Sequence, residues 1–199
     1  MAESRALTHL EIAQGVDRHL AAHHGIISRS EALQLGMSNA GVARRRKAES
    51  WHAAGHSVFR AASHPDTWHS RARAAAIGLD ALVSHRAALH LWGIDDAPRS
   101  KLEVTIPFSA RRTASDVCVH RTKQPGLMDP TCIDAIPVTG LSRTILDTAA
   151  VVGPRRLDFI VDAVLRQKML DWPDLYEVCL LYTSPSPRDR TRSRMPSSA

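Results

Sequence analysis

The chain has 199 residues, of which 26 are Lys or Arg and 20 are Asp or Glu, so its formal net charge is +6. That length allows one or two domains, and 44% hydrophobic with 23% charged residues is ordinary globular usage, which excludes a wholly disordered or fibrous chain. No apolar run is long enough for a membrane helix or a secretory signal, and three scattered cysteines form no disulfide framework, so we expect a cytoplasmic protein.

The first predicted elements are two helices. Leu10, Val16 and Leu20 recur at helical spacing in the opening segment. Ser28 followed by Glu31 is a capping box, in which each side chain satisfies a free backbone amide at the start of a helix. The sequence therefore predicts one longer helix followed by a short, capped one.

A third helix and a hairpin follow. Ser38 is a favourable N-cap for a helix over about residues 39–48. Short segments at 51–53 and 57–60 flank Ala-Gly-His, which is typical of a small hairpin. Helix, helix, turn, helix and hairpin is the order of a winged helix-turn-helix, which we assign to residues 1–62.

A second unit of mixed α/β structure is predicted over residues 63–178, after a turn-rich linker around Pro65. Strands are indicated by alternating apolar residues and helices by caps and periodicity. The expected helices cover 67–79, 85–92, 139–152 and 154–168, and the expected strands 102–106, 117–120 and 133–138. Ser84 is the expected N-cap of the second of these helices. The fold class predicted for the whole chain is α+β.

The last segment, 179–199, differs in composition from the rest. Cys179–Asp189 and Ser193–Ala199 read as the translation of a sequencing-library adapter, so we expect a disordered artefact there. Without it, residues 1–62 hold eight basic and five acidic residues, whereas 63–178 hold fourteen of each. All the remaining excess positive charge thus lies in the first unit, which favours a polyanionic partner.

The basic run Arg-Arg-Arg-Lys at positions 44–47 is the strongest local signal. With Val42 toward the core, helical geometry turns Arg44 and Lys47 outward, Arg45 to a flank and Arg46 to the inner rim. In a helix-turn-helix such residues face double-stranded DNA. A solvated face beside a helix C-terminus is the alternative. The predicted DNA-binding residues are Ser38, Asn39, Ala40, Ala43, Arg44, Arg45, Lys47, His52, His56 and Arg60.

Other chemistry finds little support in the sequence. His85 and His90 are five apart and do not share a helix face, so we expect no metal site. Ser84, His120 and Asp147 could form a triad only on paper, because no nucleophile elbow surrounds the serine. No glycine-rich phosphate loop occurs. We therefore predict no catalytic residue and no cofactor.

The chain resembles the AbiEi-type antitoxins of type IV toxin–antitoxin systems, specifically their actinobacterial members. The resemblance is carried by HGIISRSEALQLGMS (24–38), Trp51, VFR (58–60), VSHRAALHLWGI (83–94), EVTIP (103–107), VHR (119–121) and IPVTGLSRTILD (136–147). It implies a regulator that binds an operator and represses its own operon, and that opposes a nucleotidyltransferase toxin indirectly. Arg46 departs from the family pattern where an apolar residue is usual, as do Glu49 and Ser57 where glycines are usual.

Two alternatives remain open. Similar chains continue into a domain resembling very-short-patch-repair endonucleases, so this chain could be the N-terminal part of such a protein. The Asp…Glu-x-Lys arrangement that such chemistry requires does not occur in residues 1–178, and we expect no enzymatic activity from the chain as given. The second unit could instead be a protein-interaction module. No heptad seam predicts an oligomeric state.

Overall fold

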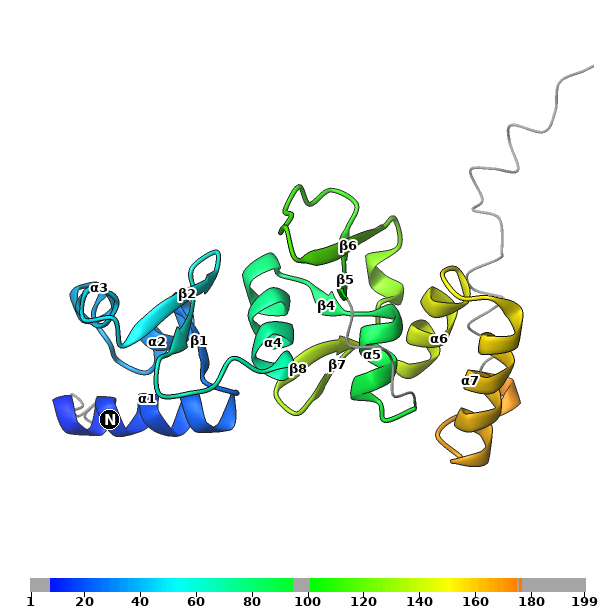
Figure 1. Ribbon diagram of the computed structural model, residues 1–199, viewed down its shortest axis with the longest axis horizontal. Helices are drawn as coiled ribbons and strands as arrows, with labels where there is room; N and C mark the ends of the chain where they lie inside the picture. The colour runs from blue at the N-terminus through cyan, green and yellow to red at the C-terminus, as the bar shows by residue number, and fades with distance from the viewer. Residues whose placement is uncertain (1–7, 95–100, 175, 177–199) are drawn as a thin grey trace, which may run out of the picture.

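The computed structural model describes residues 8–94, 101–174 and 176 of the chain (Figure 1). The segment 179–199, where we expect an adapter-derived tail, lies outside the described residues. The described part contains helices and two separate sheets, which confirms the mixed α+β class.

The amino-terminal part combines three helices with a three-stranded antiparallel sheet. Its elements are α1 (His9–Ala22), β1 (Ile26–Ser28), α2 (Arg29–Gln34), α3 (Asn39–Lys47), β2 (Trp51–Gly55) and β3 (Val58–Ala61). The strand order is β1-β3-β2, so β3 is central. The three helices and the hairpin of β2 and β3 agree with the sequence prediction, whereas β1 was not predicted.

Local caps fix the helix boundaries in this part. Ser28 Oγ accepts a hydrogen bond from the Glu31 amide at 3.1 Å, and Glu31 Oε2 accepts one from the Ser28 amide at 2.7 Å. Ser38 Oγ accepts from the Gly41 amide at 3.1 Å. Gly36 ends α2 with φ +93°, a conformation that glycine adopts without strain. Both predicted caps are therefore confirmed, and they set the turn between α2 and α3.

The core of this part lies between α1, α2, α3 and one face of the small sheet. Val16 of α1, Val42 of α3 and Trp51 of β2 are buried there together. The single buried residue of α3, Val42, is 4% exposed, so this short helix is held by one side and leaves the other in solvent.

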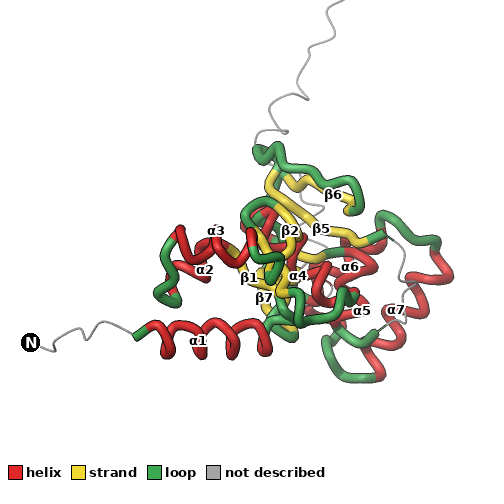
Figure 2. Tube along the Cα trace, turned by 60° about the vertical axis from the view of Figure 1, so that its left-hand side comes forward, coloured by secondary structure: helices red, strands yellow, loops and turns green. Residues whose placement is uncertain are grey.

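The second part contains a five-stranded sheet with strand order β6-β5-β4-β8-β7. Its elements are α4 (Trp68–Leu79), β4 (Leu82–Val83), α5 (His85–Leu91), β5 (Leu102–Pro107), β6 (Val117–Thr122), a 3-10 turn η1 (Pro125–Leu127), β7 (Pro130–Ile133), β8 (Ile136–Thr139), α6 (Leu141–Ala149) and α7 (Pro154–Arg166). In Figure 2, α5, α6 and α7 gather on one side of the strands and α1–α3 on the other.

Two predictions for this part are wrong. The single strand expected over 133–138 is instead the hairpin of β7 and β8, whose turn residues Asp134 and Ala135 have φ of +49° and +61°. Ser84 precedes α5 but makes no side-chain cap, because its hydroxyl is used elsewhere in the core. The two-residue strand β4 escaped prediction because its alternation is too short to detect.

Helix α4 lies between the two sheets and packs against both (Figure 1). Its Ala74 contacts Ile26 and Val58 on the outer face of the small sheet, and other residues of α4 join the core of the large sheet. The buried Arg73 of α4 pairs with Glu31 of α2 at 2.5 Å and donates to a backbone carbonyl in the β7–β8 turn. The boundary predicted after residue 62 precedes this helix, which joins the two parts.

Candidate nucleic-acid interface

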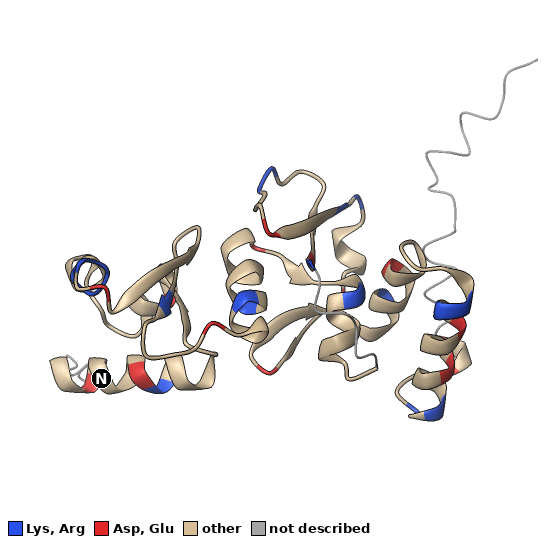
Figure 3. Cartoon of the chain, viewed as in Figure 1, with Lys and Arg blue, Asp and Glu red and all other residues tan. Residues whose placement is uncertain are grey.

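Helix α3 presents its basic residues at one end of the molecule, far from α7 (Figure 3). Opposite the buried Val42, the solvent-facing side carries two alanines and two cations. These exposed residues are Ala40, Ala43, Arg44 and Lys47. Their placement agrees with the helical geometry that the sequence predicted. A smooth, cationic face results, in which the small side chains leave the helix backbone accessible.

The two central arginines pack along the edge of the core. The Arg45 guanidinium lies over the Trp51 ring, 5.4 Å from its centroid, and the Arg46 guanidinium lies 5.5 Å from the centroid of the Phe59 ring. Such cation–π contacts hold the stem against apolar surface and leave the charged group near solvent. Arg46 thus covers the Phe59 ring from outside the core.

The basic run forms no ion pair with any carboxylate of the described residues. Among the residues that the structure describes, ion pairs join other cations to acidic groups, and none involves residues 44–47. A surface cation without an acidic partner keeps its full attraction for an external anion. The positive field of α3 is therefore available to a partner.

Arg29 extends this surface and was missed in the sequence. Its side chain, at the start of α2, donates from Nε and Nη2 to Asn39 Oδ1 at 3.1 and 2.9 Å. Both residues are exposed. The contact crosses the turn between α2 and α3. Its two residues are ten positions apart in the sequence, and helical periodicity does not indicate such a pair. Asn39 consequently has its oxygen engaged and only its amide N–H groups free to donate outward.

The structure separates the hairpin residues from this surface. Trp51 faces the core beneath α3, and side chains alternate along a strand, so His52 points to the opposite face together with its cross-strand neighbour Arg60. There they line a cavity of about 710 Å³ between β2, α4 and the start of β6. The Arg60 guanidinium donates to the His64 carbonyl at 2.5 Å. His56, in the hairpin turn, is exposed and also borders this cavity.

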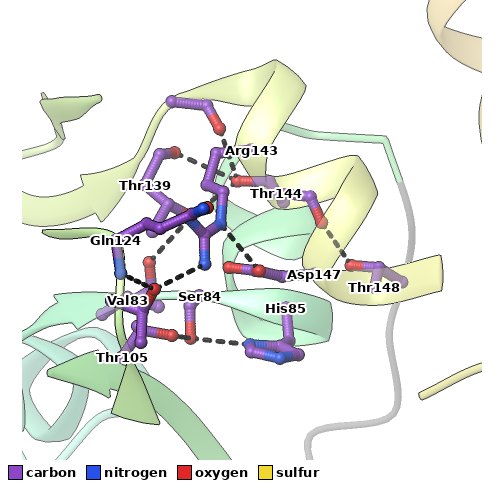
Figure 4. Close-up of polar contacts among 12 residues, drawn as sticks. Val83, Ser84, His85, Thr105, Gln124, Thr139, Arg143, Thr144, Asp147 and Thr148 are labelled. Atoms are coloured by element: carbon purple, nitrogen blue, oxygen red, sulfur yellow. Dashed lines mark hydrogen bonds and ion pairs between the residues drawn. The ribbon is translucent and has the colours of Figure 1, made fainter. Parts of the chain in front are cut away.

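A buried polar network in the second part occupies the positions considered for a catalytic triad (Figure 4). Ser84 is fully buried, and its hydroxyl bonds Thr105 Oγ1 at 2.8 Å and His85 Nδ1 at 2.9 Å. Burial, and next the neighbouring His120, lowers the pKa of His85 to about 3. The serine hydroxyl is therefore engaged by His85, and His120 is not its partner.

Asp147 pairs with Arg143 inside the same region. Arg143 Nε donates to Asp147 Oδ1 at 2.7 Å, and both side chains are almost completely buried. Burial raises the pKa of Asp147 despite the adjacent guanidinium. On the neighbouring α6 turns, the Thr144 and Thr148 hydroxyls bond backbone carbonyls within the helix. These contacts give the two threonine hydroxyls and one oxygen of Asp147 hydrogen-bond partners, which is a structural role.

The comparisons with known proteins bear on the fold. No family model matches the chain, and no curated protein matches it. Among solved structures, the chain is similar to the RV2827C protein from Mycobacterium tuberculosis, with a TM-score of 0.53 and 13% sequence identity over 92% of this chain and 74% of that one. The two proteins therefore share an overall fold that includes both parts of this chain.

Among the described residues, no helix combines the length and the apolar character needed to cross a membrane.

Proposed function

We propose that this chain binds double-stranded DNA through a winged helix-turn-helix formed by α1–α3 and the β2–β3 hairpin, and that it regulates transcription. The observation that carries the proposal is the solvent-facing side of α3, where Arg44 and Lys47 stand beside Ala40 and Ala43 and pair with no carboxylate of residues 8–94 or 101–174. In this motif α3 is the helix that enters the major groove.

The two kinds of residue on α3 have different roles in this proposal. Ala40 and Ala43 allow close approach of the helix and can contact thymine methyl groups. Arg44 can donate two hydrogen bonds to O6 and N7 of a guanine, which reads sequence. Lys47, at the end of the helix, neutralises phosphate and contributes affinity without sequence preference.

The residues at the turn add to this surface. Arg29 donates to the Asn39 side-chain oxygen, so only the Asn39 NH₂ group remains to contact DNA. It can donate a hydrogen bond to N7 of guanine or adenine. Arg45, on a flank of α3, and Ser38, at its N-cap, stand at positions suited to the phosphate backbone. Because His52 and Arg60 lie on the strand face opposite the Trp51 side chain and α3, the hairpin contributes through its exposed turn at His56.

The biological role proposed for this DNA binding is that of an antitoxin-like repressor of its own operon, acting in the cytoplasm. The resemblance to AbiEi-type antitoxins supports this role, with a nucleotidyltransferase toxin opposed indirectly. DNA fragments from upstream of the gene are then the expected operators.

Fluorescence anisotropy with labelled duplexes tests the proposal on the full chain at low salt. We expect tighter binding to the upstream fragment than to a scrambled duplex of equal length. Arg44→Ala should reduce that preference by about 1–3 kcal/mol, whereas Lys47→Ala should weaken both duplexes equally. Arg155→Ala, which removes an exposed cation from α7, is the matched control and should change neither. Failure to bind any duplex would overturn the proposal.

A further inference from the structure

Three side chains of different chemistry converge at the β5–β6 edge of the large sheet. Glu103 comes from β5, and Cys118 and His120 come from β6. None of them belongs to the DNA-binding surface proposed above. A thiol, an imidazole and a carboxylate are all ligands of transition metals.

The strand geometry explains why these residues meet. Strands β5 and β6 are parallel, and Glu103 lies directly opposite Cys118 in their register. Cys118 and His120 are two residues apart on one strand, so their side chains project from the same face. The backbone therefore places all three side chains on one side of the sheet.

Two distances between the ligand atoms match those of a tetrahedral zinc site. Cys118 Sγ lies 3.5 Å from His120 Nε2, and His120 Nε2 lies 3.6 Å from Glu103 Oε1. The three ligand atoms all lie within 4.8 Å of one another. With bonds of about 2.3 Å to sulfur and about 2.0–2.1 Å to nitrogen or oxygen, tetrahedral angles separate such atoms by roughly 3.3–3.6 Å. The side chains need to move little to enclose an ion.

The surroundings orient two of the three ligands. Arg86 donates to both oxygens of Glu103, at 2.8 and 3.1 Å, and its backbone amide donates to Oε2 at 3.0 Å. The His85 ring stacks on the His120 ring with their centroids 3.6 Å apart. Hydrogen-bonded carboxylates and fixed imidazole rings are the supports that metal ligands have in proteins.

The cluster is also open to solvent on one side. Glu103 is buried, but Cys118 is half-buried and the His120 side chain is 26% exposed. An ion could therefore enter beside these two residues, and water could complete its coordination. Mg²⁺ and Ca²⁺, which prefer oxygen ligands, do not suit a site with sulfur and nitrogen.

We propose that Glu103, Cys118 and His120 form a three-residue zinc-binding site. Loss of Cys118 or His120 removes a direct ligand, and each variant should bind zinc at least about 100-fold more weakly, since loss of a mere supporting group costs 10–100-fold. The site is independent of the proposed DNA binding.

The test uses the full chain, expressed without a histidine tag and stripped with a chelator. Zinc uptake is measured by equilibrium dialysis and elemental analysis for the wild type, Cys118→Ser, His120→Asn and the control Cys132→Ser, whose cysteine is exposed on β7 at the opposite edge of the sheet. We expect one tightly bound ion in the wild type and the control, and its loss in the other two.

The absorption spectrum of the cobalt-substituted wild type tests the ligands without a variant. Co²⁺ bound at this site should show the visible absorption of tetrahedral coordination together with a near-ultraviolet thiolate charge-transfer band. Circular dichroism verifies that each variant is folded. The proposal is wrong if the cobalt complex lacks the thiolate band, or if folded Cys118→Ser takes up as much zinc as the wild type, because weak binding spread over surface histidines would then explain the uptake.

Discussion

Arg44 of α3 and three arginines of other elements have opposite surroundings. Arg44 is exposed and forms no ion pair within the described part of the chain, whereas Arg73, Arg86 and Arg143 each bind a carboxylate at 2.5–2.8 Å. The paired residues hold elements together: α4 to α2, the start of α5 to β5, and one turn of α6 to the next. The comparison shows that the excess charge of the chain says little about function until each cation's partner is known.

Breaking a paired arginine should have the largest effect on stability. Arg143→Met leaves the Asp147 carboxyl buried without its guanidinium, which should cost about 3–5 kcal/mol of unfolding free energy. Urea denaturation followed by circular dichroism measures this loss. Arg44→Met, the same substitution on α3, should change stability by less than about 0.5 kcal/mol. Equal losses in the two variants would contradict the distinction between them.

Arg29 sharpens the comparison, because its partner is an amide and not a carboxylate. Arg29→Ala should weaken binding to the upstream duplex about tenfold, since it removes a cation from the proposed surface and releases Asn39. Anisotropy titration measures the change. An unchanged affinity, with the fold intact, would confine the contact surface to α3 alone.

A smaller, pH-dependent effect is expected at His19, where α1 meets Glu31 and Arg73. Burial, and then the stacked His23, lowers the pKa of His19 below its ordinary value of 6.5. Below pH 6.5 the unfolded chain therefore takes up a proton that the folded chain does not, and stability should fall as the pH falls, by at most about 1.4 kcal/mol per pH unit.

Urea denaturation between pH 7 and 5 tests this expectation. The slope of stability against pH should be smaller in His19→Gln than in the wild type. A slope that His19→Gln does not alter would assign the pH dependence to other groups.

The smallest effect concerns the hairpin. Glu49 and Ser57 have φ of +54° and +56°, a region that costs a side chain roughly 1–2 kcal/mol. Ser57→Gly should therefore stabilise the chain by up to about 1 kcal/mol after the greater entropy of unfolded glycine is counted. Thermal denaturation measures it. Destabilisation would mean that the Ser57 side chain makes a contact of its own.

Local signals made much of the fold predictable. The Ser28 and Ser38 caps, the outward face of α3 and the β2–β3 hairpin depend on residues within a few positions of one another, so the sequence indicates them. Strands β1 and β4 have only three and two residues, and their pairing with strands far along the chain decides their existence. No short pattern could indicate them.

The candidate sites depended more on tertiary contacts. Alternation places His52 and Arg60 on the face opposite Trp51, but it does not say which face enters the core. The burial of Trp51 decides this. Helical spacing does not relate Cys118 to His120, because the two residues lie two apart and share a face only on a strand. Glu103 joins them only through the parallel register of β5 and β6. A serine before a helix predicts a cap, and the Thr105 hydroxyl that bonds Ser84 instead is distant in sequence.

The salt dependence of duplex binding tests most directly whether the cations of α3 contact DNA. The logarithm of the binding constant falls with the logarithm of salt concentration by about 0.9 for each phosphate contact. We expect Arg44→Ala/Lys47→Ala to bind more weakly, with a slope shallower by about 1 because the phosphate contact of Lys47 is lost. The double variant Arg155→Ala/Lys168→Ala, with the same change in charge, should keep the wild-type slope. Identical slopes for the wild type and the α3 variant would contradict the account.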